Sequence, residues 1–226
     1  MIKITKSTEP VQLSVEREKA SGCYRHPDIV DVIRKDFYNR CYLCEANPQS
    51  INIEHLVPHR DVHELKFKWE NLFWSCGHCN NIKLAKYDNI LDCTTQVDIE
   101  DILIYQFEPF PTENVHVEII LSHRENLQAK QTQALLQNIF NGTTTLKSIE
   151  SNGLRKLITT ELINLQSLLR DLDNENKSVE EIDDIKLRLT SALSPNSLFA
   201  SFKRSKVRSM PQLLAHIKAH IPHLRL

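Results

Sequence analysis

Glycine is scarce in this sequence, and the scarcity excludes common phosphate-binding motifs. Only 4 of the 226 residues are glycine, whereas an average protein contains about 7% glycine. The patterns GxGxxG and GxxxxGK[ST] are both absent, so the chain has no Gly-rich loop of the kind that cradles nucleotide phosphates. The shortage also favours a largely helical fold over a β-sandwich.

Long apolar runs are missing as well. No stretch approaches the roughly 18 apolar residues that a transmembrane helix needs, and the first ten residues contain no apolar signal-peptide core. We therefore expect a cytoplasmic protein without a membrane partner. The composition, 41% hydrophobic and 25% charged, is that of a globular protein, and the length suits one or two domains of about 150 residues.

The cysteines are arranged for metal binding. Four of the six form two CxxC units that are 31 residues apart, Cys41/Cys44 and Cys76/Cys79. Disulfides are disfavoured in a reducing cytosol, whereas two CxxC turns supply the four thiolates of a structural zinc site. The sequence therefore predicts a structural Zn²⁺ on these four residues, with a thioredoxin-like redox role as the alternative. The other two cysteines are expected to be packing residues.

The segment between the CxxC units contains polar residues of the types that serve as catalytic groups and metal ligands. Residues 51–53 alternate apolar and polar side chains, which indicates a short half-buried strand, and Glu54 and His55 follow directly. A polar loop comes next, and then Asn71 shortly before the second CxxC unit. Residues 80–86 have the apolar spacing of a short helix.

This order resembles the HNH endonucleases with a zinc-bound ββα-metal core. The resemblance covers about residues 38–90, and a plain zinc module would need the cysteines but not the polar residues between them. It implies hydrolysis of phosphodiester bonds with His55 as the general base, because an imidazole of ordinary pKa near 6.5 accepts a proton from water at neutral pH. In the family, a conserved asparagine braces the loop that holds this histidine, and Asn71 matches it.

The resemblance also implies a catalytic Mg²⁺ or Mn²⁺, which prefers oxygen ligands. Glu54 is the expected carboxylate ligand, although adjacent strand residues point to opposite faces, so the backbone must bend for Glu54 and His55 to share a site. Asn80 occupies a family position that is often histidine. Its side-chain amide oxygen is still a donor that could bind the metal ion. His59 is the alternative third ligand. The predicted catalytic residues are therefore His55, Asn71 and Asn80.

Two groups of basic residues are candidate contacts to nucleic-acid phosphates. The net charge of −1 does not indicate a basic surface, but residues 195–226 contain six Lys or Arg, three His and no acid. Within this part, we expect contacts from Lys203, Arg204, Lys206 and Arg208. On the helix after the second CxxC unit, Lys83 and Lys86 are expected to contact phosphates. For both groups, an ordinary solvated basic face is the alternative.

The predicted fold class is α+β and mostly α. Residues 1–37 are expected to be an N-terminal extension that is helical near 27–38, residues 38–92 the nuclease core, and residues 93–226 a mainly helical region. That last region is either a scaffold for the core or a docking platform for a partner. Within it we expect a strand at 115–121.

Further elements of the C-terminal region follow from local patterns. Apolar residues at 3- and 4-residue steps predict helices from residue 127 onward and over 154–169. Asn141-Gly142 indicates a turn between them. Ser178 and Glu181 have the spacing of a capping box at the start of another helix.

A looser resemblance extends beyond the core. The run from residue 53 to 83, the turn at 140–143 and the basic segment 199–208 are similar to the HNH subunit of Septu-type anti-phage defence systems, including retron-associated versions. This resemblance implies an ABC-type ATPase partner that restrains the nuclease, and further a retron reverse transcriptase with its RNA–DNA product.

The sequence as a whole thus predicts a metal-dependent endonuclease that acts on DNA by default. Hydrolysis by an activated water does not require the 2′-hydroxyl, so RNA such as tRNA stays open as the substrate. A zinc-binding module without catalytic activity, which recognises nucleic acid or protein, is the rival from another class. A structural adaptor with an inactive site is the remaining alternative, because Asn80 departs from the family pattern.

Overall fold

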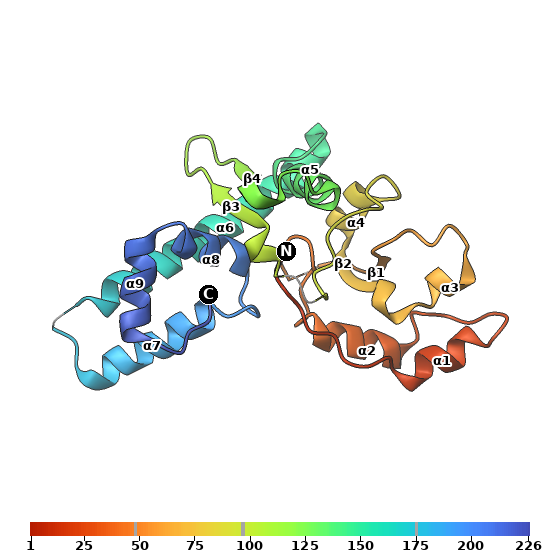
Figure 1. Cartoon of the computed structure of the whole chain (residues 1–226), viewed down its shortest axis with the longest axis horizontal. Helices are drawn as coiled ribbons and strands as arrows, with labels where there is room; N and C mark the ends of the chain where they lie inside the picture. Colours follow the sequence, from red (N-terminus) through yellow and green to blue (C-terminus); the bar gives the residue numbers. More distant parts are fainter. Residues whose placement is uncertain (48, 96–97, 175) are drawn as a thin grey trace.

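The structure is a computed structural model that describes residues 1–47, 49–95, 98–174 and 176–226. The described part is α+β, about half helical, with two small antiparallel sheets, and this confirms the predicted class. Figure 1 shows two lobes: α1 to α4 with β1 and β2 form one, and α6 to α9 form the other. The strands β3 and β4 and the helix α5 lie between and above them.

The N-terminal lobe begins with two helices, α1 (Val11–Arg17) and α2 (Pro27–Asp36). Proline at the first position of α2 has no N–H group that would need a partner there, and the His26 side chain accepts a hydrogen bond from the Asp28 amide as the N-cap. The helix predicted near residues 27–38 is therefore confirmed. After α2, Tyr38 and Asn39 adopt left-handed backbone angles, which turn the chain toward the first CxxC unit.

The polar residues of interest lie on a strand pair and the helix that follows it. Strand β1 (Ile51–His55) pairs antiparallel with β2 (Leu72–Cys76), and β2 leads directly into α4 (Gly77–Lys83). The connection between the strands contains α3 (His63–Lys66) and a 3₁₀ turn (Trp69–Asn71). Helix α4 packs against both strands, so this segment is a ββα unit.

The second sheet connects the lobes. Strand β3 (Leu103–Phe107) pairs antiparallel with β4 (Val115–Ile119), and α5 (Leu127–Asn141) covers β4. The strand expected at 115–121 is confirmed as β4, whereas β3 was not expected. Short 3₁₀ turns flank the sheet at Ile99–Asp101 and Leu121–His123.

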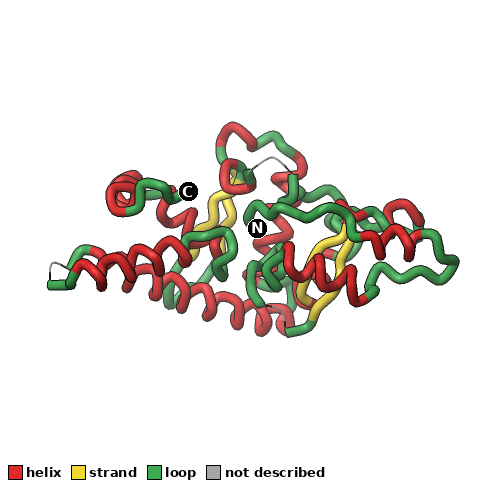
Figure 2. The backbone as a smooth tube through the Cα atoms, turned by 90° about the horizontal axis from the view of Figure 1, so that it is seen from below, coloured by secondary structure: helices red, strands yellow, loops and turns green. Residues whose placement is uncertain are grey.

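Four helices build the C-terminal lobe. These are α6 (Thr145–Leu172), α7 (Val179–Ala192), α8 (Ala200–Arg208) and α9 (Pro211–His220). Figure 2 shows α6 extending from the tip of this lobe to the middle of the molecule. The predicted capping box is present at the start of α7. The predicted turn lies at Gly142, whose φ of +81° and close approach to Ser148 leave no room for a Cβ atom.

Two hydrophobic cores lie along the chain, and their boundary falls within α6. The larger core includes Ile29, Phe37, Phe73, Leu103 and Ile158, and so draws on all three predicted domains. The smaller core begins with residues of the second half of α6 and continues through α7 and α9. The boundaries expected at 37/38 and 92/93 therefore do not separate independent cores.

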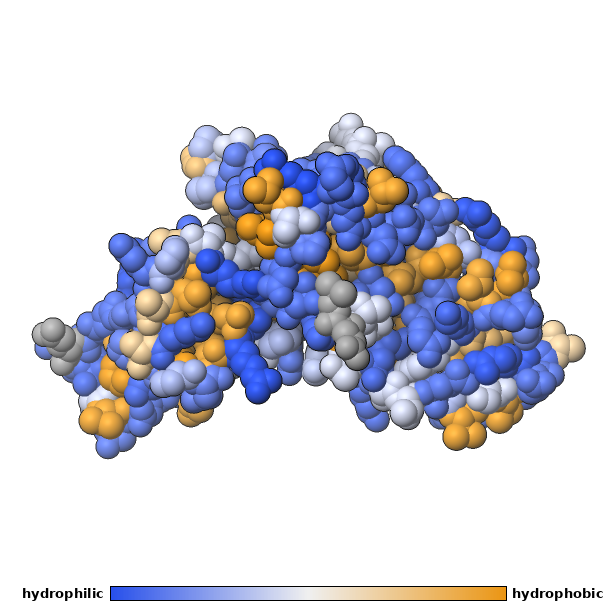
Figure 3. All heavy atoms as spheres, in the orientation of Figure 1, coloured by the Kyte–Doolittle hydropathy of each residue, from blue (hydrophilic) through white to orange (hydrophobic). Residues whose placement is uncertain are grey.

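The surface is mixed in character. Figure 3 shows a mainly hydrophilic face with separate apolar patches, one of them over α7 and α9, and a notch between the lobes. In the part of the chain that the structure describes, no helix combines the length and apolar character that a membrane span requires.

Candidate functional site

The two CxxC units meet at one point. Their ligand atoms, the Sγ atoms of Cys41, Cys44, Cys76 and Cys79, all lie within 4.8 Å of one another, and the Cys44 and Cys76 sulfurs are 3.9 Å apart. Four sulfurs placed tetrahedrally at about 2.3 Å from a zinc ion would be about 3.8 Å from each other. The cluster can therefore hold a metal ion, and its size and ligand type fit structural zinc.

Electrostatics within the cluster also favour a cation. Burial opposes ionisation of Cys41, but hydrogen bonds from the other three thiols lower the pKa of the Cys41 thiol well below its ordinary value. Burial raises the pKa of the Cys79 thiol instead. A bound metal would displace the remaining protons. The Cys76 sulfur also accepts a hydrogen bond from the Cys79 amide and so caps α4.

The other two cysteines lie outside the cluster. Cys23 is exposed and Cys93 is buried. Burial raises the pKa of the Cys93 thiol above its ordinary value, as expected for a packing residue.

The structure buries His55 and fixes one of its ring nitrogens. The residue is 8% exposed, and its ring packs edge-on against Tyr24, with ring centres 4.9 Å apart. Nε2 lies 3.0 Å from the carbonyl oxygen of Lys66. A carbonyl only accepts hydrogen bonds, so Nε2 carries the proton, and in the neutral ring Nδ1 presents a lone pair. Among the described residues, Nδ1 has no hydrogen-bond partner.

The same environment keeps this imidazole uncharged. Burial lowers the pKa of His55 to about 4, although the hydrogen bond to Lys66 opposes the shift. At neutral pH the ring is therefore a free base and can accept a proton at Nδ1.

Asn71 holds the loop around His55. Its Oδ1 accepts a hydrogen bond from the Val57 amide at 2.7 Å, and its Nδ2 donates to the carbonyls of Val57 and Leu65 at 2.8 and 3.0 Å. Leu65 immediately precedes Lys66, the partner of His55. The buried Asn71 side chain therefore joins the two ends of the loop, as expected for a bracing asparagine.

Glu54 does not share a site with His55. The strand stays regular, with Glu54 paired with Phe73 and His55 paired with Leu72 in the register, so the two side chains lie on opposite faces. The Glu54 carboxylate forms a buried ion pair with Lys83 and accepts a hydrogen bond from Tyr42, each at 2.5 Å. Burial raises the pKa of Glu54, and these two partners oppose the rise.

This arrangement corrects two expectations from the sequence. Both carboxylate oxygens of Glu54 are engaged, so Glu54 does not have the open geometry of a catalytic metal ligand. Lys83 is fully buried, and its ammonium group also donates to the His55 carbonyl at 3.0 Å. It supports the strand from within the core and is not placed to contact a phosphate. Lys86 is exposed on the surface, where such a contact is possible.

The remaining candidates for a catalytic metal have different environments. The ring of His59 lies beside that of His55, with centres 4.6 Å apart. Its Nδ1 accepts a hydrogen bond from the Asp61 amide at 3.1 Å, so the proton of the neutral ring is on Nε2, which makes His59 a donor rather than a ligand. Asn80 lies on α4 and is half-buried, without a side-chain hydrogen bond to the described residues.

Among the described residues, the structure does not show the expected Mg²⁺ or Mn²⁺ site. A hard cation is usually held by one or two carboxylates, and the expected carboxylate is committed to Lys83 and Tyr42. Apart from the cysteine cluster, the described residues contain no group of three or more His, Cys, Asp or Glu side chains close enough to hold a metal.

The C-terminal basic segment faces mostly inward. Lys203 and Arg204 are buried on α8 and form ion pairs with Glu161 at 2.8 Å and Glu100 at 2.6 Å. Arg208 pairs with Asp101. The expected phosphate contacts of Lys203 and Arg204 are therefore wrong, because internal carboxylates neutralise both. Lys206 alone of the four is exposed without a partner among the described residues.

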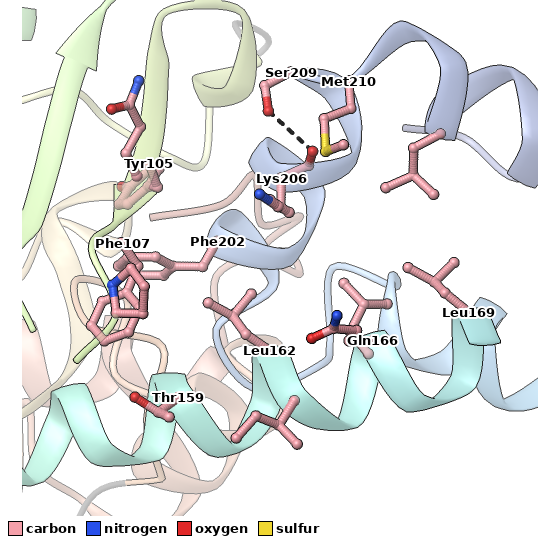
Figure 4. Close-up of a pocket in the computed structure, with 15 residues that line it drawn as sticks. Tyr105, Phe107, Thr159, Leu162, Gln166, Leu169, Phe202, Lys206, Ser209 and Met210 are labelled. Carbon is pink, nitrogen blue, oxygen red and sulfur yellow. Dashed lines mark hydrogen bonds between the residues drawn. The ribbon is translucent and has the colours of Figure 1, made fainter. Parts of the chain in front are cut away.

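A further cavity lies away from His55 and the cysteine cluster. It has a volume of about 700 Å³ and lies between β3, α6, α8 and α9. Figure 4 shows mainly apolar side chains around it, among them Phe107, Leu162 and Phe202, with Lys206 as the charged residue. No His, Cys, Asp or Glu lines it, so it offers neither an acid–base pair nor metal ligands.

Comparison with known proteins adds no family. Neither the models of known protein families nor the curated proteins contain a match to this chain.

Proposed function

We propose that this chain hydrolyses phosphodiester bonds of nucleic acid in the manner of an HNH endonuclease. The observation that carries the proposal is the state of His55, an uncharged imidazole with one nitrogen fixed by Lys66 and the other without a partner among the described residues. His55 belongs to a ββα unit whose second strand and helix carry two members of the cysteine cluster. Asn71 braces the loop beside it.

In the proposed reaction, Nδ1 of His55 removes a proton from water as the water oxygen attacks phosphorus. The bond between phosphorus and the leaving oxygen then breaks, and the leaving oxygen takes a proton from solvent. A free imidazole with a pKa of about 4 is a weak base. The negative charge of a bound phosphate stabilises the imidazolium and so strengthens this base. His59 Nε2–H, beside the His55 ring, is suited to donate to a phosphate oxygen.

The catalytic Mg²⁺ or Mn²⁺ stays a prediction from the resemblance. Since Glu54 is engaged elsewhere, we assign no step to such an ion. The structural zinc is a separate matter: the cysteine cluster fits it, and its role would be to hold the turn after α2 against β2 and α4.

The test compares three proteins: wild type, His55→Ala, and His223→Ala as a control on an exposed histidine. Each is incubated with plasmid DNA and with total tRNA, with Mg²⁺, with Mn²⁺, and after removal of divalent ions. Cleavage by wild type and His223→Ala, but not by His55→Ala, is the expected result. Bound zinc is measured in parallel, so that loss of structural metal is not mistaken for loss of a catalytic ion.

The same experiment separates the alternatives. Cleavage of tRNA but not plasmid would support the RNA version of the activity. Binding of either polymer without cleavage would favour a non-catalytic zinc module. Equal cleavage by wild type and His55→Ala would refute the role of His55.

The ATPase partner is likewise a proposal that rests on sequence resemblance alone. If the isolated chain is inactive, the assay is repeated with an ABC-type ATPase from the same defence locus. Activity that appears only in the mixture would support a nuclease that needs this partner, whereas lower activity of an active chain in the mixture would support restraint by it. The reverse transcriptase with its RNA–DNA product is added in the same way.

A further inference from the structure

A small cavity lies where the N-terminal lobe meets helices α6, α7 and α8. Its volume is about 350 Å³. Its polar lining comes from residues far apart in the sequence: Arg40, Glu161, Arg188, Ser191, Ser197 and Lys203. Arg40 directly precedes the first cysteine of the metal cluster, whereas the others belong to the C-terminal lobe. Folding therefore brings three cations from separate elements to one place.

The charges in this cavity are not balanced. Lys203 pairs with Glu161 at 2.8 Å, and this pair is largely buried. Arg188 has a carboxylate nearby, Asp184 at 3.7 Å, but both side chains are mostly exposed, and such surface pairs contribute little. Of the residues that the structure describes, no acidic side chain other than Glu161 lines the cavity. The lining thus has an excess of positive charge on Arg40 and Arg188.

Arg40 stands out among the shielded cations. Its Nε and Nη1 atoms are shielded from solvent and have no hydrogen-bond partner among the described residues. By contrast, three buried cationic side chains of the described residues each face a carboxylate: Lys83 faces Glu54, Lys203 faces Glu161 and Arg204 faces Glu100, at 2.5 to 2.8 Å.

A bound anion would supply the hydrogen-bond partner that the Arg40 guanidinium lacks among the described residues. Donors that are shielded from water and have no hydrogen-bond partner cost free energy, and the Nε and Nη1 atoms of Arg40 are two such donors among the described residues. A guanidinium is suited to bind phosphate through two parallel hydrogen bonds. The Ser191 hydroxyl, which has no side-chain partner among the described residues, is a further donor.

We propose that this cavity is a binding site for a phosphate group, held by Arg40 and Arg188. Its volume is at the small end of ligand pockets and suits a mononucleotide. The phosphate of a free nucleotide and the terminal phosphate of a nucleic acid share this chemistry. Either one would link the chain segment before Cys41 to helix α7 and so join the two lobes.

The proposal is tested by titration calorimetry and thermal denaturation with inorganic phosphate, with AMP, and with a short 5′-phosphorylated oligonucleotide. The oligonucleotide arm uses the His55→Ala protein, so that cleavage does not consume the ligand. Wild type should bind AMP and be stabilised by it. A preference for AMP identifies a nucleotide site, and a preference for the oligonucleotide identifies a nucleic-acid end.

Substitutions locate the binding. Arg188→Gln, on the exposed face of α7, and Arg40→Gln should each weaken binding about tenfold or more. Arg34→Gln removes the same charge from an exposed position on α2 and should leave binding unchanged. Because Arg188 is mostly exposed, its substitution should not impair folding, so a result with that variant stands even if Arg40→Gln is unstable.

Two outcomes would overturn the proposal. One is the absence of binding by wild type to all three probes at millimolar concentration. The other is an equal loss of affinity in Arg188→Gln and Arg34→Gln, which would show only a general effect of charge. The proposal does not depend on the nuclease activity, since binding is measured directly.

Discussion

The Nε2 atom of His55 lies 3.0 Å from the carbonyl oxygen of Lys66, and the neighbouring carbonyl, that of Leu65, accepts a hydrogen bond from Asn71. The residue that braces the loop therefore also positions the acceptor that fixes the His55 ring. In the proposed reaction, this link gives Asn71 a role without contact to substrate: it holds His55 in the tautomer that leaves the lone pair on Nδ1.

The first prediction concerns Asn71→Ala. The substitution removes the buried Asn71 amide group and leaves the Val57 amide and the carbonyls of Val57 and Leu65 without this partner, and should lower the free energy of unfolding by about 2–4 kcal/mol. Nuclease activity should fall as well, because the His55 ring loses its orientation. Urea denaturation and cleavage assays measure the two effects. Asn81→Ala, at an exposed position on α4, is the control, and an Asn71→Ala protein as stable as this control would contradict the prediction.

The second prediction concerns pH. The ordinary pKa of histidine is 6.5, and that of His55 in the folded protein is about 4. Between these two pH values the unfolded chain binds a proton at His55 that the folded chain does not bind. The contribution of His55 to the free energy of unfolding is therefore fully present above pH 6.5 and decreases as the pH is lowered toward 4. His55→Gln removes this contribution. Urea unfolding at pH 7.5 and pH 5 should therefore show a larger decrease in the free energy of unfolding for wild type than for His55→Gln. An equal decrease in the two proteins would contradict this prediction.

The third prediction separates a structural Glu54 from a metal-binding one. Lys83→Met leaves a buried carboxylate without its cation and should cost about 3–5 kcal/mol. The double variant Glu54→Gln with Lys83→Met should recover part of that loss, because no buried charge remains. Thermal denaturation of the single and double variants gives the comparison. A stable Glu54→Gln protein that has lost only its Mg²⁺-dependent activity would instead show that Glu54 is a ligand.

The fourth prediction concerns the cysteine cluster. Wild type should contain one zinc ion per chain, and Cys44→Ala should lose it together with stability and solubility, because structural zinc contributes directly to folding. Cys23→Ala, which changes an exposed cysteine outside the cluster, should keep both. Elemental analysis and denaturation measure the outcome, and a stable Cys44→Ala protein without zinc would refute the structural role.

Local patterns were sufficient for many elements. The two CxxC units predicted the cysteine cluster because each places two sulfurs within one turn, and the cluster needs only that the two turns meet. The alternation at 51–53 predicted β1, and the Ser178/Glu181 spacing predicted the capping box of α7. In each of these cases the pattern that made the prediction lies within a few residues of the chain. Strand β3 was missed because its pairing depends on β4, across a connection that the local pattern does not specify.

The sequence by itself determined which residue types lie near His55, but only the tertiary structure decided which partners they have. Glu54 adjoins His55 in the chain, and a regular strand sends it to the opposite face, where Lys83 from α4 neutralises it. Likewise, α8 has the composition of a nucleic-acid-binding helix, yet Lys203 and Arg204 face Glu161 and Glu100 from distant elements. A charge in a sequence has no fixed partner. The packing of the folded chain determines which counter-charge lies beside a charged residue, because a buried charge is stable only where the fold places such a partner.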